Sequence, residues 1–190
     1  MGKQLARDKE MGSSTYLRLG LESCNKAVSE PPKIFSVLCF VLEKSIRKNE
    51  KLLKSSKCKN MATIFHSSIA PGVSIKQYID RIFKYSNCSP SCLVVAYIYM
   101  DKFLQQVGDR LTSLNVHRLL ITSIVLAAKY VEDECYSNAY YAKVGGVSKE
   151  EMNRMEMKFL VSIDFRLHVT LETFNRYCSQ LEIEQSAAGK

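Results

Sequence analysis

Residues 126–165 read LAAKYVEDECYSNAYYAKVGGVSKEEMNRMEMKFLVSIDF, and this stretch decides the fold class. Ser137 predicts the start of a short helix, which Gly145 and Gly146 end. Ser148 and Glu151 form a capping-box pattern, in which each side chain can satisfy the other's backbone N–H, so we expect a second helix to begin there. Apolar residues then recur at the spacing of one helix face: Met152, Met155, Phe159, Leu160 and Ile163.

The same reasoning extends the helical prediction upstream. Ser74 can cap a helix, and Ser89-Pro90 begins another, because proline suits the first helical position. Asn115 can cap the next helix, which is apolar on nearly all sides and should therefore be central. One further helix is expected before these five and one after them. No stretch alternates like a strand, so we predict an all-α protein: a block of five helices with an extra N-terminal helix and a C-terminal helix.

These helices divide the chain into four parts. Residues 1–31 are expected to be a flexible leader, and residues 32–72 an N-terminal helix with a basic linker. Residues 73–166 hold the five-helix block, and residues 167–190 the C-terminal helix and tail. No apolar run reaches the roughly 20 residues that a membrane-spanning helix needs, and no apolar stretch of a secretory signal is evident. We therefore expect a protein of the nucleus and cytoplasm without membrane contact.

Cysteine usage agrees with a reducing compartment. The chain has seven cysteines, an odd number, and no two are spaced as C-x-x-C. Buried free thiols explain this better than disulfides. Cys88 and Cys92 have a C-x-x-x-C spacing with His66 upstream, but a structural zinc site normally shows two tight ligand pairs. We therefore predict no metal.

The formal net charge is +8, and much of the excess lies between Lys44 and Lys59. The simplest interpretation is a solvated helix end and loop. Two sharper interpretations stay open: a nuclear import signal and a contact for an acidic partner.

Motifs for catalysis are missing from the sequence. It has no G-x-x-x-x-G-K-[ST] or G-x-G-x-x-G nucleotide motif, no kinase signature and no G-x-S-x-G elbow. The three histidines are scattered, and the acidic run at 132–134 follows a predicted helix end, where a solvated turn is expected. We therefore predict a binding module rather than an enzyme, with no catalytic residues, no cofactor and no small-molecule substrate.

Two charged residues have apolar neighbours in the sequence. Lys129 follows Leu126-Ala127-Ala128, and Glu156 lies between two methionines. A charge among apolar neighbours is costly unless it is paired or used. One hypothesis is that each side chain extends separately to the rim of its helix. The other is that the two form a pair at an exposed edge between the helices, where they offer donors and an acceptor to a partner's backbone.

The strings around these residues resemble a known family. The stretch 126–165 resembles the second half of a cyclin box, with A-A-K-[YF] ending one helix and M-E, a hydrophobic stretch and D-F in the other. CLVVAYIYMDKFL resembles the second helix of that box, whose aspartate is matched by Asp101. SIKQYIDRIFKYSNCSPSCLVVAYIYMDKF, SLNVHRLLITSIVLAAK and NAYYAKVGGVS look more narrowly like plant U-type cyclins, also called P-type, which are similar to the phosphate-pathway cyclins of yeast. The resemblance covers roughly residues 32–181.

The resemblance implies a single cyclin box and a regulatory function. Such a subunit binds and activates a cyclin-dependent serine/threonine kinase, A-type for a plant cyclin, in cell-cycle or nutrient control. Lys129 and Glu156 match the lysine and glutamate with which cyclins contact the backbone flanking the kinase's C-helix. The third and fifth helices would supply the surrounding groove, with these apolar candidates: Leu120, Ile124, Met152, Met155 and Phe159.

Asp101 is assigned a structural role by the same resemblance. The arginine that usually pairs with this aspartate is missing at its expected place, and Arg81 or Lys76 are the candidates to replace it. A second hypothesis for function is a cyclin-fold scaffold of the transcription type, which binds nucleic acid or other proteins. The charge of +8 favours it, but the basic cluster lies outside the box, so nucleic acid is not the expected partner.

Overall fold

The structure is a computed structural model that describes residues 14–21, 32–55 and 62–188. Over these ranges the chain consists of helices and their connections, without a strand. The helices are α2 (Lys33–Ser55), α3 (Ile75–Ser86), α4 (Pro90–Val107), α5 (Val116–Val131), α6 (Asn138–Gly145), α7 (Lys149–Ser162) and α8 (Leu171–Ala188). The predicted all-α fold is confirmed, with α3 to α7 as the block of five, α2 before it and α8 after it.

Local capping chemistry explains where α3, α4 and α7 begin. Ser74 Oγ accepts from the Gln77 N–H, and Gln77 Oε1 accepts from the Ser74 N–H, each at 3.2 Å. Ser148 and Glu151 form the same reciprocal box at α7, with both distances 3.0 Å. Ser89 caps α4. These side chains satisfy N–H groups that a helix leaves without partners at its start, and all three predicted starts are confirmed.

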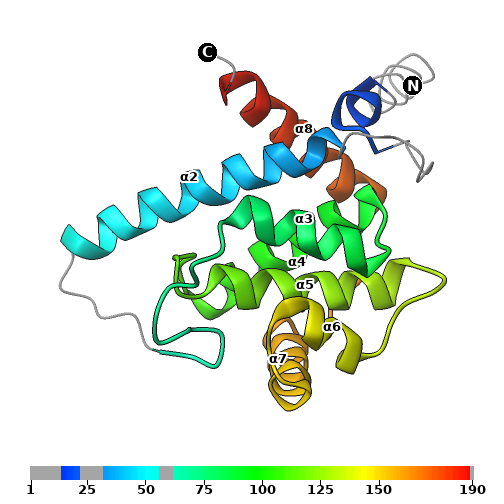
Figure 1. Cartoon of the computed structure of the whole chain (residues 1–190). Coiled ribbons are helices and arrows are strands. Elements are labelled where there is room, and N and C mark those ends of the chain that lie inside the picture. Colours follow the sequence, from blue (N-terminus) through cyan, green and yellow to red (C-terminus); the bar gives the residue numbers. More distant parts are fainter. Residues whose placement is uncertain (1–13, 22–31, 56–61, 189–190) are drawn as a thin grey trace.

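Helix α5 is the centre of the bundle. It packs most extensively against α4 and also contacts α3, α6 and α7 (Figure 1). Every residue from 119 to 128 is buried, as the apolar sequence predicts. The end of α6 lies close against it: a Cβ atom at Gly145 would be 2.8 Å from Ile121 Cγ1. Glycine is therefore what allows α6 to approach α5 so closely.

The first described residues pack against α8. Residues 14–19 are helical, and Leu19 is fully buried. The Thr15 hydroxyl donates to the Glu182 carboxylate at 2.8 Å, and Arg18 forms an ion pair with that carboxylate at 2.7 Å. The prediction of a flexible leader is wrong for residues 14–21, and the rest of that leader lies outside the described residues. The segment is too short to show an apolar period, so the sequence did not reveal it.

Helix α2 lies across the bundle and contacts α3 and α8 (Figure 1). Its buried residues end at Ile46, but the helix continues to Ser55. Most of the basic residues expected in a helix end and linker are therefore on the helix itself, while Lys57 and Lys59 lie outside the described residues. In the part of the chain that the structure describes, no helix is both long and apolar enough to cross a membrane.

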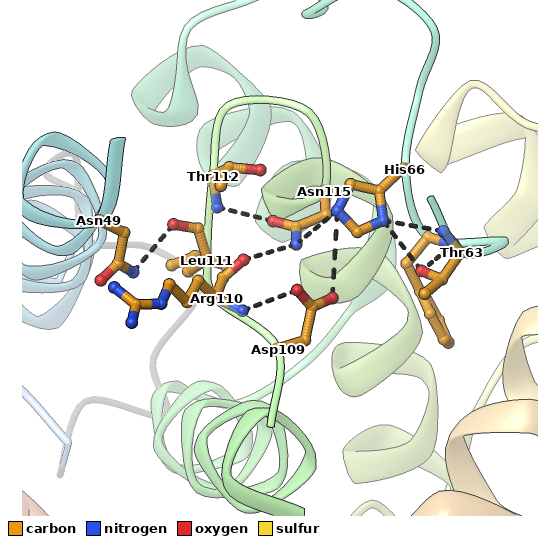
Figure 2. A network of polar contacts seen from close by, with 9 residues as sticks. Asn49, Thr63, His66, Asp109, Arg110, Leu111, Thr112 and Asn115 are labelled. Carbon is orange, nitrogen blue, oxygen red and sulfur yellow. Dashed lines mark hydrogen bonds and ion pairs between the residues drawn. The ribbon is translucent and has the colours of Figure 1, made fainter. Parts of the chain in front are cut away.

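A polar network joins the segment after α2 to the turn between α4 and α5 (Figure 2). Asn115 is fully buried, and its side chain accepts from the Thr112 N–H and donates to the Arg110 carbonyl, both at 2.8 Å. His66 Nε2 lies 4.0 Å from the Asp109 carboxylate and 3.4 Å from Asn115 Nδ2. The prediction that the Asn115 side chain caps α5 is wrong. Its backbone is already helical, with φ −118° and ψ −16°, and its amide bonds to the preceding turn instead.

Candidate functional site

Lys129 and Glu156 form an ion pair that links α5 to α7. The Nζ of Lys129, in the last turn of α5, lies 2.6 Å from Oε1 of Glu156, in the middle of α7. The Lys129 side chain is 36% exposed and the Glu156 side chain 15% exposed. The predicted pair at an exposed edge is confirmed. The alternative, in which each side chain extends separately to the rim of its helix, is wrong.

Asn138 holds the second oxygen of the Glu156 carboxylate. Its Nδ2 donates to Glu156 Oε2 at 2.6 Å and to Asn153 Oδ1 at 2.8 Å. Ser137 caps α6, which places Asn138 at its first position. Three helices thus fix one carboxylate, with an ammonium from α5 and an amide from α6. Asn138 is not among the predicted site residues, and its one signal in the sequence is its place directly after a capping serine.

The five apolar residues predicted to surround the pair lie in the core. They are between 0 and 4% exposed: Leu120, Ile124, Met152, Met155 and Phe159. Phe159, for example, stacks on Phe103 with ring centroids 4.6 Å apart. The prediction that they line a groove is wrong, because the apolar stripe of a helix turns toward the bundle interior, where burial stabilises it. They support the helices that carry the pair.

The exposed apolar side chains beside Lys129 come from the next two residues of the chain. Tyr130 is 49% exposed and Val131 42% exposed. Both line an open groove of about 380 Å³, which continues to Leu171 and Phe174 of α8. An exposed apolar groove of this kind is typical of a protein-binding surface.

Helix α7 also presents apolar side chains to solvent. Met157 is 57% exposed and Val161 52% exposed. Just after the helix, Asp164 and Phe165 lie in the left-handed region, at φ 52° and 55°, and the Phe165 N–H donates to the Leu160 carbonyl at 2.9 Å. Two successive residues without glycine in this region are uncommon. This ending leaves Phe165 60% exposed.

The arrangement is suited to binding a polypeptide. An ammonium carries three hydrogens, so Lys129 keeps donors beyond the one that points to Glu156. The Glu156 carboxylate keeps lone pairs that can accept from a backbone N–H. Among the described residues, no group of three histidine, cysteine, aspartate or glutamate side chains is placed to hold a metal ion. Cys88 and Cys92 are buried, and His66 belongs to the network of Figure 2.

Comparison with known proteins identifies the family. The family model described as Cyclin matches residues 33–167. The chain belongs to the cyclin family. It is 52% identical to Cyclin-P3-1 of Oryza sativa subsp. japonica over 186 residues, which cover 97% of this chain and 79% of the rice protein. It is 48% identical to Cyclin-U3-1 of Arabidopsis thaliana over 172 residues, 90% of this chain and 77% of that protein.

These relatives agree with the predicted resemblance to plant U-type and P-type cyclins. Cyclin-U4-1 of Arabidopsis thaliana is a third, 46% identical over 155 residues, 81% of this chain and 77% of that protein. The family match begins at residue 33, so it includes α2 as well as the five-helix block. Membership in the family supports a regulatory role for this cyclin.

Asp101 of this cyclin joins α4 to α8. Its Oδ2 accepts from the Tyr177 hydroxyl at 2.6 Å and from Gln105 Nε2 at 2.8 Å. Burial raises the pKa of Tyr177, and its hydrogen bond to Asp101 raises that pKa further, so the phenol remains protonated and donates. The contact ties the second helix of the box to the C-terminal helix.

The predicted partners of Asp101 bind elsewhere. Lys76 pairs with Asp80 on its own helix, with 3.0 Å between Nζ and Oδ2. Arg81 lies over the Tyr78 ring, with its guanidinium carbon 5.0 Å from the ring centroid. The prediction that Arg81 or Lys76 pairs with Asp101 is therefore wrong. A partner on another helix, far along the chain, leaves no pattern in the sequence.

We expect Tyr177→Phe to lower the free energy of unfolding by about 1–2 kcal/mol, because the Asp101 carboxylate then loses the hydrogen bond from the Tyr177 hydroxyl and keeps the one from Gln105. Urea unfolding followed by circular dichroism measures this. Tyr97→Phe is the matched control: this ring packs near Tyr177, with centroids 6.0 Å apart, and the change should cost less than about 0.5 kcal/mol. An equal loss in both variants would contradict the assigned bond.

Proposed function

We propose that this cyclin binds a cyclin-dependent serine/threonine kinase through the surface around Lys129 and Glu156, and that binding activates the kinase. The observation that supports the proposal is the ion pair itself. Its two charges lie 2.6 Å apart at an accessible edge between α5 and α7. Family membership supports the regulatory role, and the kinase contact is our inference.

The ion pair offers complementary groups to the two ends of a partner helix. Lys129 can donate to a backbone carbonyl, and Glu156 can accept from a backbone N–H. Asn138 and Lys129 already hold the Glu156 carboxylate in place, so little side-chain freedom remains to be lost on binding. The groove that begins at Tyr130 and Val131 would take apolar side chains of the partner.

Activation follows from where the partner helix is held. Phosphoryl transfer in a protein kinase requires that a glutamate of the C-helix pairs with the phosphate-binding lysine, and that the magnesium-binding aspartate is in place. A cyclin bound beside the C-helix favours that arrangement and contributes no bond chemistry of its own. A shift from 1:99 to 99:1 in favour of the active state takes about 5.5 kcal/mol of differential affinity.

We propose an A-type kinase as the partner, because the relatives of this chain are plant cyclins. A role in cell division or nutrient control, in the nucleus and cytoplasm, is part of the same proposal. The experiment mixes the purified chain with a purified A-type kinase. We expect a 1:1 complex in size-exclusion chromatography and a large rise in phosphorylation of a peptide substrate. If neither complex nor activation appears with any plant cyclin-dependent kinase, the proposal is wrong.

A double variant on α2 should leave activation unchanged. Lys51 and Lys54 are exposed near the C-terminal end of α2, which Figure 1 places at the opposite end of α5 from the loop after Lys129. Exposed charges separated by more than about 10 Å are largely screened at physiological salt. The Lys51→Glu/Lys54→Glu variant should therefore stimulate the kinase to within about twofold of the unchanged chain. A large drop in kinase activation by this variant would mean that the kinase interface also includes α2.

A further inference from the structure

The outer side of α2 carries a row of exposed cations: Arg47, Lys48, Lys51 and Lys54, here called the basic face. The inner side of the same helical turns is occupied. Asn49 donates to the Leu111 carbonyl at 2.9 Å, and the Glu50 carboxylate accepts from the Ser113 N–H at 3.0 Å. These contacts hold the helix against the turn before α5, so the basic face points away from the protein.

The basic face keeps an excess of positive charge over the two glutamates nearest to it. Glu43 and Glu50 stand four residues before Arg47 and Lys54, and hydrogen bonds from Ser113 together with the Lys54 charge lower the pKa of Glu50. Lys44, one turn earlier, pairs with Glu184 of α8 at 2.6 Å. No such ion pair with another described residue is found for the four cations of the basic face. Arg47 and Lys51 are four residues apart, and Lys51 and Lys54 three, so they are neighbours on the helix surface and repel. An anionic ligand would relieve this repulsion.

An open pocket of about 320 Å³ adjoins the basic face. Ile46 and Arg47 of α2 form one side, and Val116 and His117 of α5 form another. The segment before α3 forms a third side with Val73, whose carbonyl oxygen lies 2.9 Å from His117 Nε2. The lining is mainly apolar and carries one cation, Arg47, and one carboxylate, Glu43. Arg47 belongs to both the pocket and the basic face.

We propose that the basic face and this pocket together dock an acidic peptide segment of a partner protein. Carboxylates of the segment would lie along Arg47, Lys51 and Lys54, and one apolar side chain would enter the pocket. The occupant is assigned by charge complementarity with the basic face and by the apolar lining beside it.

This surface is separate from the proposed kinase surface. His117 and Lys129 are twelve residues apart on α5, or about 18 Å along the helix axis. The two surfaces therefore lie toward opposite ends of α5, and the docking proposal does not depend on the identity of the kinase.

An acidic peptide fits better than nucleic acid. The cations from Arg47 to Lys54 extend about 10 Å along the helix, much less than the track of phosphate contacts in a nucleic-acid interface. The pocket lining contains no tyrosine or phenylalanine on which a base would stack.

Fluorescence anisotropy tests the proposal on the full chain. The probe is a labelled peptide with one leucine followed by four glutamates, and its partner peptide carries glutamines instead. We expect the acidic peptide to bind, and the glutamine peptide and the Lys51→Glu/Lys54→Glu variant each to weaken binding about tenfold. Val73→Asp, which places a carboxylate at the pocket, should weaken it too. Lys33→Glu, at the other end of α2, is the control and should bind like the unchanged chain.

Three results would overturn the proposal. They are no binding of the acidic peptide at millimolar concentration, equal binding of both peptides, and equal binding by the basic-face variant and the unchanged chain. Tighter binding of a short DNA duplex than of the peptide at 150 mM salt, lost in the same variant, would also overturn it in favour of nucleic acid. Kinase activation by the basic-face variant is measured in parallel, so a failure here is distinguishable from a failure of the kinase proposal.

Discussion

The Glu156→Lys variant should fail to bind a cyclin-dependent kinase while it keeps its fold. The change removes the carboxylate that Lys129 and Asn138 contact at 2.6 Å each, and it places a second ammonium beside the first. Loss of one member of a recognised charge pair at an interface weakens binding by at least about 30-fold. An accessible pair contributes only about 1 kcal/mol or less to folding, so the thermal midpoint should change little. Isothermal titration with the kinase, beside a thermal melt, measures both.

Two companion variants make this test specific. Glu150→Lys reverses a charge on the same helix, six residues earlier and therefore about 240° around the axis, and it should bind the kinase normally. The double variant Lys129→Glu/Glu156→Lys restores an internal pair with opposite polarity. It should melt like the unchanged chain and still fail to bind. Kinase binding by the double variant would mean that the pair serves the fold alone.

The Phe159→Ala variant should lose about 3–5 kcal/mol of unfolding free energy, the usual cost of removing a buried phenylalanine. Phe159 is fully buried, stacks on Phe103 at 4.6 Å and meets the edge of Phe65 at 6.1 Å. The change leaves a cavity where α7 packs on the bundle. Urea unfolding measures the loss.

Met157→Ala is the matched control for Phe159→Ala. It removes an apolar side chain of α7 that is 57% exposed, and the cost in stability should stay below about 0.5 kcal/mol. The two variants therefore compare a buried position with an exposed position on the same helix. If Phe159→Ala melts like the unchanged chain and Met157→Ala does not, α7 is rotated relative to the structure described above.

Helix starts could be predicted because the chemistry that fixes them is local. Ser74 with Gln77, and Ser148 with Glu151, satisfy each other's backbone within three residues, so the pattern is complete in the sequence. The ion pair of Lys129 and Glu156 is one of two hypotheses that the sequence leaves open. A charge among apolar residues is costly unless it is paired or used, but a long side chain can also extend to the rim of its helix. The structure decides between the two.

The direction in which each helix faces could not be predicted at the level of single residues. The apolar stripe that contains Phe159 was assigned to a binding surface, although burial in the core stabilises the same stripe. The contacts of Asp101 with Tyr177, and of Asn138 with Glu156, join residues on different helices. Such contacts depend on how the helices cross, which no local pattern records.

The glycine at the end of α6 has a consequence for partner affinity. Helix α6 spans eight residues, from Asn138, which holds the Glu156 carboxylate, to Gly145, which touches α5. A methyl group at position 145 would meet Ile121 at 2.8 Å, so the short helix would have to tilt, and its first residue would move with it. A larger side chain at position 145 would thus move Asn138 at the other end of the helix, and with it the Glu156 carboxylate that Asn138 holds. Homologues that differ there would differ in how tightly they hold the same partner.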